Sequence, residues 1–273
     1  MRYVVDHDLH IHSFLSACSR NPEQNPKRMV EYARQNGLKK ICVTDHFWDE
    51  AQGSGAPCYG EESIFDKKKW LGEIPQQDDV DFLFGVETEL DRNMKLGLAP
   101  EHYDAADFIV IPTTHLNMMG LTLNKTEGDS TEKRAKLWIK RLESVLSKDL
   151  PFHKVGIAHL TCVTFAYWSR ATELECYRKI PDSEIYRLMQ RAAEVGVGIE
   201  INSCSMMYKP EEEDEILRIY RIAKECGCKF YCGSDAHQPH ELDRAMGLFQ
   251  KAVDALGLTE EDKFPVWELS VDK

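Results

Sequence analysis

Seven short apolar segments recur along the chain, and each is followed directly by polar or charged residues. Segments with the spacing of amphipathic helices separate most of them. Short apolar strands that alternate with helices are typical of a parallel sheet with right-handed connections. The predicted strands are an opening strand that carries His10 and His12, then residues 40–44, 81–86, 108–111, 155–158, 197–201 and 230–232. The sequence therefore predicts an α/β chain, and closure of the sheet would give a (β/α)7 barrel.

The predicted helices begin and end at residues that favour helix ends. Asn25 and Pro26 open the first helix and Gly37 follows it, while Asp182 is expected to cap a later helix that ends before Gly196. The predicted helices cover residues 26–36, 62–74, 131–146, 182–195, 210–226 and 241–256. No linker or internal repeat divides the chain, so we expect one domain over residues 1–273.

Two segments do not follow the strand and helix alternation. Residues 48–60 are rich in Gly, Ala and Pro, which predicts a long loop on the side of the active site. The C-terminal tail contains Phe264, Val266, Trp267 and Leu269, and we expect it to pack on the outside of the barrel.

Charge and cysteine content exclude several classes of protein. The net charge is −12 and no stretch is dominated by Lys and Arg, so the chain lacks the basic surface expected for nucleic-acid binding. No apolar run approaches the length of about 18 residues that spans a bilayer. The N-terminus lacks a signal-peptide pattern, and nine scattered cysteines without a C-x-x-C pair indicate reduced thiols. We therefore expect a cytoplasmic protein without nucleic-acid or membrane partners, and nothing in the sequence specifies its oligomeric state.

Chemically active side chains stand at or just after the ends of the predicted strands. In a β/α barrel these ends converge on the face where active sites are built, and in an open doubly wound sheet they would gather along one edge. Each histidine taken alone is more often an ordinary polar residue than a ligand, and an isolated His10-x-His12 is more often two surface histidines on one strand face. The residues concerned are His10, His12, Asp45, His46, Glu87, His115, His159, Asp235 and His237.

Six histidines and several carboxylates exceed the four ligands that one zinc ion takes. Two or three metal ions are therefore expected, and mixed nitrogen and oxygen ligands favour Zn, Mn or Fe over Mg or Ca. Bound cations would attract an anionic substrate despite the negative net charge. Cys226, Cys228 and Cys232 lie close together in sequence, but their spacing is unusual for a zinc site and buried small side chains are the better interpretation.

The ordered set of motifs resembles the polymerase and histidinol phosphatase (PHP) superfamily of metal-dependent phosphoesterases. The resemblance covers nearly the whole chain, from residue 8 to residue 237. It implies a distorted (β/α)7 barrel similar to a TIM barrel, with a site for three metals at the C-terminal ends of the strands. The matching motifs are Asp8-x-His10-x-His12-Ser13, Thr44-Asp45-His46, Gly85-Val86-Glu87, His115, His159 and Gly233-Ser234-Asp235-x-His237.

The resemblance also implies how the metals are divided among the ligands. One metal would be held by His10, His12, Glu87 and Asp235, and a second by Glu87, His115 and His159. A third would take His46 and His237 together with a residue on the loop after the first strand. At that loop position the family usually has His or Asp, whereas this chain has Cys18, which can ligate zinc as a thiolate or leave the third position weak.

Other residues are expected to support these ligands. Asp8 and Asp45 are predicted to accept the N–H groups of ligating histidines and so to orient their rings. Glu89 would share a strand face with Glu87 or point to solvent, and Glu200 and Asn202 are expected to contact the substrate or the ligands.

Substrate-binding and catalytic roles follow from phosphate chemistry. Arg20 and Arg170 are predicted to bind the phosphate, with Lys209 as a further candidate and an ordinary surface charge as the alternative for each. Glu87 and Asp235 would act through the metals, and His46 or a bound water would donate a proton to the leaving group.

The leading hypothesis is therefore a metal-dependent phosphoesterase that hydrolyses a small phosphomonoester, with histidinol phosphate as the first named candidate. A metal-dependent amidohydrolase is an alternative, since such enzymes also place H-x-H on a first strand. No predicted strand ends in the lysine that amidohydrolases normally use to bridge their metals. A domain that binds metals without catalysis is the third alternative.

Overall fold

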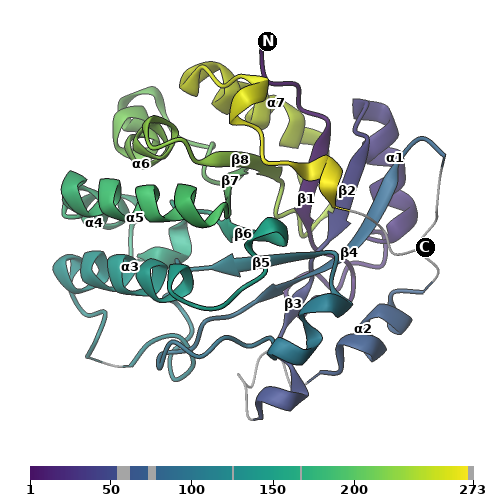
Figure 1. Cartoon of the computed structure of the whole chain (residues 1–273), viewed down its shortest axis with the longest axis horizontal. Coiled ribbons are helices and arrows are strands. Elements are labelled where there is room, and N and C mark those ends of the chain that lie inside the picture. Colours follow the sequence, from purple (N-terminus) through teal and green to yellow (C-terminus); the bar gives the residue numbers. More distant parts are fainter. Residues whose placement is uncertain (54–61, 73–77, 125, 167, 270–273) are drawn as a thin grey trace.

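A parallel sheet curves into a nearly closed barrel with helices around its outside (Figure 1). This computed structural model describes residues 1–53, 62–72, 78–124, 126–166 and 168–269. The strands follow the order β1-β2-β4-β5-β6-β7-β8, and each neighbouring pair is parallel. Their bounds are β1 (His7–Ile11), β2 (Lys40–Val43), β4 (Asp81–Thr88), β5 (Phe108–Pro112), β6 (Val155–Ala158), β7 (Gly198–Asn202) and β8 (Lys229–Gly233). The predicted seven-stranded α/β barrel is confirmed, including its distortion.

The first and last strands meet at the carboxyl end of the barrel. The backbone N–H of Asp235 donates to the carbonyl of His10 at 2.7 Å, and the N–H of His12 donates to the carbonyl of Ala236 at 3.1 Å. The N–H of Ser234 also donates to the Asp8 carboxylate at 2.9 Å. The segment after β8 thus closes the ring where the metal-binding motifs lie.

A short additional strand, β3 (His46–Phe47), was not predicted. The sequence suggested one strand that ends at Thr44, but after a break at Thr44 and Asp45 the chain pairs again with β4 in the same register. This pairing places His46 opposite Glu87. The continued register therefore brings a histidine of one motif next to the carboxylate of another.

An irregularity in β1 sets the direction of its two histidines. Asp8 pairs with Ile41 and Ile11 pairs with Val43, so Leu9 and His10 together oppose one residue of β2. A bulge of this kind adds a residue and re-aims the side chains that follow it. Leu9 therefore packs in the apolar interior, and His10 still shares the polar site with His12.

The helices agree with the predicted ones in most cases. Asn25 caps α1 by accepting from the N–H of Arg28, and Gly37 ends it with φ of 69°. Asp182 is the first residue of α5 and not its cap, which is Pro181, and α4 was not predicted. Parts of the predicted loop 48–60 and helix 62–74, namely residues 54–60 and 73–74, lie outside the described residues. The helices are α1 (Pro26–Asn36), α2 (Ile64–Trp70), α3 (Thr131–Leu146), α4 (Arg170–Arg178), α5 (Asp182–Val195), α6 (Glu213–Glu225) and α7 (Pro239–Leu256).

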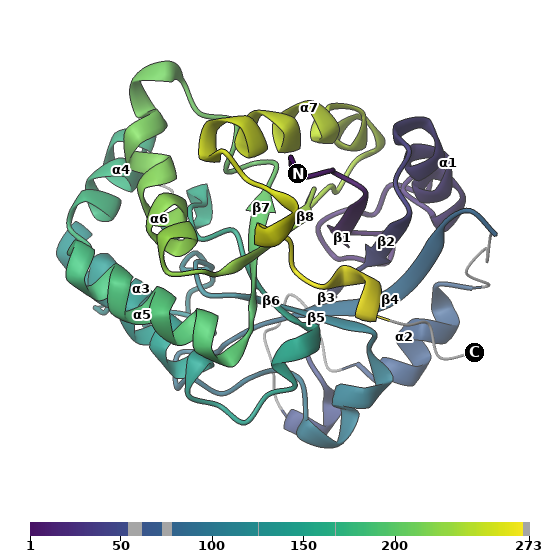
Figure 2. The ribbon, with the colours of Figure 1, turned by 45° about the horizontal axis from the view of Figure 1, so that its top comes forward.

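The C-terminal tail packs inside the amino end of the barrel, so its predicted place on the outside is wrong. Phe264, Val266 and Leu269 join a buried cluster, and Trp267 is 63% exposed. Figure 2 shows this yellow segment crossing the strands near the middle of the view. Interior-facing residues of the strands complete the cluster, namely Leu9, Cys42, Leu83, Phe108, Val110, Ala158 and Tyr231.

The tail enters the barrel because small residues leave room for aromatic rings. A Cβ added at Gly156 would lie 2.4 Å from the Tyr231 hydroxyl, and one at Gly198 would lie 3.1 Å from the Phe264 ring. The rings of Phe108 and Phe264 meet edge to face with their centroids 6.1 Å apart. The tail therefore fills the end of the barrel opposite the metal-binding motifs.

Candidate metal centre

Donor atoms from β1, β4 and the segment after β8 converge at the carboxyl end of the barrel. The Nε2 atoms of His10 and His12 lie 3.1 Å apart. Asp235 Oδ1 lies 3.1 Å from His12 Nε2, and Glu87 Oε2 lies 3.4 Å from the same nitrogen. His10, His12 and Glu87 have no exposed surface. These residues form a first donor group, in which each contributes one ligand atom close to the others.

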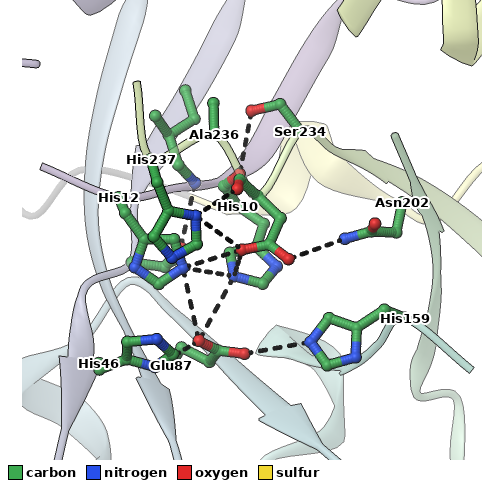
Figure 3. A network of polar contacts seen from close by, with 12 residues as sticks. His10, His12, His46, Glu87, His159, Asn202, Ser234, Ala236 and His237 are labelled. Atoms are coloured by element: carbon green, nitrogen blue, oxygen red, sulfur yellow. Dashed lines mark hydrogen bonds and ion pairs between the residues drawn. The ribbon is translucent and has the colours of Figure 1, made fainter. Parts of the chain in front are cut away.

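Glu87 links this group to a second one. Its Oε2 faces His12 and lies 2.7 Å from His46 Nδ1, whereas its Oε1 lies 3.4 Å from His159 Nε2 (Figure 3). The same Oε1 lies 3.9 Å from His115 Nε2. The two oxygens of one buried carboxylate thus serve different histidines. This is the arrangement expected of a carboxylate that bridges two metal ions.

A third donor group contains a thiol. The ligand atoms of His12, Cys18, His46 and His237 all lie within 4.8 Å of one another. The rings of His12 and His237 are stacked with their centroids 4.1 Å apart. The structure therefore brings together Cys18 and all eight of the other predicted ligands.

The histidines share a bonding pattern that fits metal ligation. Metal-binding histidines usually donate one ring N–H to a neighbouring acceptor and keep the other nitrogen for the metal. Nδ1 of His10 lies 2.7 Å from Glu200, Nδ1 of His115 lies 2.6 Å from Glu89, and Nδ1 of His159 lies 2.7 Å from the Thr114 hydroxyl. Their Nε2 atoms point to Glu87. The donor set therefore fits several divalent metal ions.

The orienting acceptors differ from the predicted ones. Asp8 accepts from the N–H of Ser234 and from the hydroxyl of Tyr32, and Asp45 accepts from the N–H and hydroxyl of Ser13. Asp8 also accepts from the backbone N–H of His10, so the prediction that it holds a histidine ring is wrong. Asp45 Oδ1 lies 4.0 Å from His12 Nδ1, and its orienting role stays a prediction.

Glu200 and Glu89 hold the rings in their place. Both carboxylates are fully buried, which settles the open choice for Glu89 in favour of the interior. Glu200 also accepts from the backbone N–H of His159 at 2.6 Å. On β7, Glu200 alternates with Ile199 and Ile201, which was the sequence signal for its side of the sheet, whereas Glu89 directly follows β4 and had no such signal.

Two of the predicted ligands have strained backbones. His159 has φ of 25° and Asp235 has φ of 54°, a region that residues other than glycine rarely adopt. Such strain is maintained when the surrounding structure requires it, and it concentrates at functional sites. Here it directs the two side chains into the centre at the points where their strands end.

Burial and neighbouring charges shift the pKa values of two carboxylates in the centre. Burial would raise the pKa of Glu87, but His46, His10 and His115 hold this pKa well below its usual range. Burial would likewise raise the pKa of Asp235, and His10 and His12 hold it low. Both carboxylates are therefore anionic, the form in which they bind metals.

Burial and neighbouring side chains also shift the pKa values of the His12 imidazole and the Cys18 thiol. Burial and the nearby His237 and His46 lower the pKa of His12 well below its usual value, so its imidazole is neutral. Burial raises the pKa of the Cys18 thiol, but hydrogen bonds with His237 and His46 outweigh it and give about 6. Both side chains are thus in the form that ligates metals.

A cavity of about 590 Å³ opens above the donor groups. Several ligands form its floor, including His46, His115 and Asp235. Arg20, with φ of 50°, is the cation among its lining residues. Its remaining walls come from Ala17, Asn117, Met118, Cys162 and Thr164.

The other predicted substrate-binding residues have different surroundings. Arg170 pairs with Glu173 at 2.9 Å and with Glu212 at 3.0 Å. Lys209 is exposed at the start of a short helical turn. Asn202 donates to Glu200 at 3.1 Å and to Asp235 at 3.4 Å, so it supports the ligands. Substrate contacts by these residues stay predictions.

The remaining sequence expectations concern cysteines and membranes. Cys228 and Cys232 are buried, as expected for small core side chains, and Cys226 is partly buried. Across the described ranges, the metal-donor groups do not include these three cysteines. No helix in the described part of the chain has the length and apolar character needed to cross a membrane.

The fold and the donor groups define a distorted α/β barrel with a centre suited to several metal ions. The sequence profile of the PHP domain matches residues 8–250. The chain therefore belongs to the PHP domain family.

Individual relatives agree with this assignment. A probable phosphatase of Aliivibrio fischeri is 36% identical over 89 residues, a stretch that covers 30% of this chain and 36% of the relative. The matched part thus spans little more than a third of that curated protein.

Solved structures with similar folds include two from bacteria. Histidinol phosphate phosphatase from Lactococcus lactis, determined with zinc, L-histidinol and phosphate, has a TM-score of 0.59 and 17% identity, covering 90% of this chain and 93% of its own. A candidate histidinol phosphatase from Listeria monocytogenes has a TM-score of 0.59 and 14% identity, covering 88% of this chain and 98% of its own. At these identities the likeness establishes the fold.

Proposed function

We propose that this protein is a metal-dependent phosphoesterase that hydrolyses a small phosphomonoester, with histidinol phosphate as the first substrate to test. The observation that carries the proposal is the buried Glu87 carboxylate, whose two oxygens face separate groups of histidines beneath an open cavity. Membership of the PHP domain family and the fold shared with a histidinol phosphate phosphatase support it.

The proposed metal ligands follow the three donor groups. They are His10, His12, Glu87 and Asp235 for the first position, Glu87, His115 and His159 for the second, and Cys18, His46 and His237 for the third. When bound, such metals activate water as a nucleophile at neutral pH and neutralise charge on the phosphate.

The protein's own groups bind and orient the substrate. The Arg20 guanidinium lines the cavity and would form paired hydrogen bonds with phosphate oxygens. Glu200 and Glu89 fix the imidazoles of His10 and His115, so the phosphate meets a rigid floor. His46 lies at this floor and is proposed to donate a proton to the leaving group when it is not serving as a ligand.

One experiment separates this function from its alternatives. Metal content is measured by elemental analysis, and the protein is assayed with Zn or Mn on histidinol phosphate, other phosphomonoesters, nucleotides and amides. We expect two to three metals per chain and phosphate release. Cleavage of amides alone would identify an amidohydrolase, and bound metals without any hydrolysis would identify a non-catalytic domain. A pure protein that binds no transition metal would refute the proposal.

A further inference from the structure

The loop after β1 carries a cysteine into the third donor group. Cys18 Sγ lies 3.2 Å from the Ser16 hydroxyl, which itself lies 3.2 Å from His12 Nδ1. Its sulfur is also among the ligand atoms that lie within 4.8 Å of one another with those of His46 and His237. Three side chains from separate elements therefore surround one position at the floor of the cavity.

Hydrogen bonds fix this loop against the segment after β8. The Ser19 hydroxyl donates to the carbonyl of His237 at 2.7 Å, and the Asn21 amide donates to Gln238 at 2.7 Å. The buried Gln24 amide donates to the carbonyls of His12 at 3.0 Å and Ala236 at 3.1 Å. Three residues that follow Cys18 thus hold its loop beside His237.

The third position differs in chemistry from the other two. Imidazole and carboxylate donors surround Glu87, and such donors bind Mn and Fe as well as Zn, with Mn the weakest of these ions. A thiolate is a soft ligand that selects zinc and similar ions over manganese. Because His12 Nε2 faces Asp235 and Glu87, the third position has Cys18, His46 and His237 as its own ligands. Three protein ligands with one open site are typical of catalytic zinc.

We propose that Cys18, His46 and His237 form a thiolate-containing metal position that selects thiophilic ions such as Zn²⁺ or Cd²⁺, while the two positions around Glu87 accept a broader range of metals. This inference rests on the proposed function for the presence of metals at the centre. If so, the third position can be distinguished from the other two by the metal ions that it binds.

Cobalt substitution tests the sulfur ligand directly. The Co²⁺-loaded protein should show a near-ultraviolet thiolate-to-cobalt charge-transfer band, and Cys18→Ser should remove that band. Cys162→Ser is the matched control, because Cys162 lines the same cavity while its sulfur lies 3.1 Å from the Thr164 hydroxyl. Persistence of the band in Cys18→Ser, or its absence from the wild-type protein, would overturn the inference.

Metal competition tests the selectivity. Elemental analysis after equilibration with Zn²⁺ and increasing excesses of Mn²⁺ should show one position in the wild-type chain that keeps its zinc at Mn²⁺ concentrations that displace zinc from the other two. Cys18→Asp should shift the preference of that position toward Mn²⁺ by about tenfold or more. An unchanged metal ratio would contradict the proposal.

Alkylation of the wild-type protein gives a result that does not depend on how the variants fold. Zn²⁺ should slow the reaction of Cys18 with iodoacetamide by about tenfold or more, measured by peptide mapping, because a ligated sulfur is a poor nucleophile. Equal rates with and without Zn²⁺ would refute ligation by Cys18. If phosphatase activity with two metals persists in that case, the proposed function stands and this inference alone fails; a chain without any transition metal would remove both.

Discussion

The two ends of the barrel are built from the same strands but have opposite chemistry. At the amino end, Leu9, Tyr231 and Phe264 pack in a dry apolar cluster closed by the C-terminal tail. At the carboxyl end, histidines and carboxylates surround an open cavity, and two of the ligands have strained backbones. Stability is concentrated at one end and reactivity at the other, as in other β/α barrels. The bulge in β1 lets one strand serve both, because it places Leu9 in the core and His10 in the centre.

The largest expected effect is at the carboxyl end. Glu87→Ala removes the carboxylate shared by two donor groups, so metal content should fall and phosphate release should drop by at least about 100-fold. Asp49→Asn is the control, since Asp49 is an equally buried carboxylate that binds His102 at 2.7 Å. Full activity and metal content in Glu87→Ala would contradict the assignment of metal binding to the carboxyl end of the barrel.

Substitutions at the amino end should change the stability of the protein and leave its metal content unchanged. Phe264 is fully buried between Phe108 and Tyr231, so Phe264→Ala should lower the free energy of unfolding by about 3–5 kcal/mol. Trp267→Ala, at an exposed position of the same tail, should change it by about 0.5 kcal/mol or less. Urea unfolding gives these values, and the metal content of folded Phe264→Ala should remain that of the wild type. Loss of metal from this variant would mean that the ends are coupled.

Metal removal should loosen the carboxyl end selectively. Chelation removes a ligand that binds the folded state, which costs about 2.7 kcal/mol for a metal present at 100 times its Kd. Hydrogen exchange should accelerate at the amides of His12 and Asp235, which pair β1 with the segment after β8. The amide of Phe264, bonded to Phe230 at 2.8 Å, should keep its protection. Uniform acceleration would show that the two ends open together.

A smaller effect is expected where a carboxylate orients a ligand. Glu200→Gln should weaken metal binding by about 10–100-fold, because it removes the carboxylate that lies 2.7 Å from His10 Nδ1. Gly233→Ala should act in the same direction, since its Cβ would lie 2.0 Å from Glu200 Oε1. Gly247→Ala on α7 is the matched control, because its Cβ would meet nothing within 4 Å. Titration calorimetry with Zn²⁺ compares the metal affinities of the three variants. Normal affinity in Glu200→Gln would contradict the role of Glu200 in orienting His10.

The sequence predicted the strands and the ligands because both follow from local patterns. An apolar run that stops at Asp45-His46 or at His159 indicates a strand end, and strand ends in a barrel converge. The structure accordingly brings eight of the nine predicted ligands into three neighbouring donor groups, and the ninth, Asp235, lies 3.1 Å from His12 Nε2.

The sequence could not predict contacts that depend on how distant segments meet. Asp8 and Asp45 adjoin the histidines in sequence, yet the carboxylates at the rings are Glu200 of β7 and Glu89, which follows β4, and each reaches a histidine on or after another strand. The tail has no periodicity that distinguishes the inside of a barrel from its outside. Helix α4 does begin with a local signal, because the Ser169 hydroxyl accepts from the N–H of Thr172, but its short apolar stripe is weak.

The backbone hydrogen bonds between β1 and the segment after β8 also bear on when the centre can form during synthesis. Histidines of the first strand become available early, but Asp235 and His237 emerge from the ribosome only after β8. A chain that stops before β8 therefore lacks both of these predicted ligands and the backbone partners of His10 and His12. The complete set of donors exists only once all seven strands have been made, so a fully occupied centre would be a molecular record that the barrel has closed.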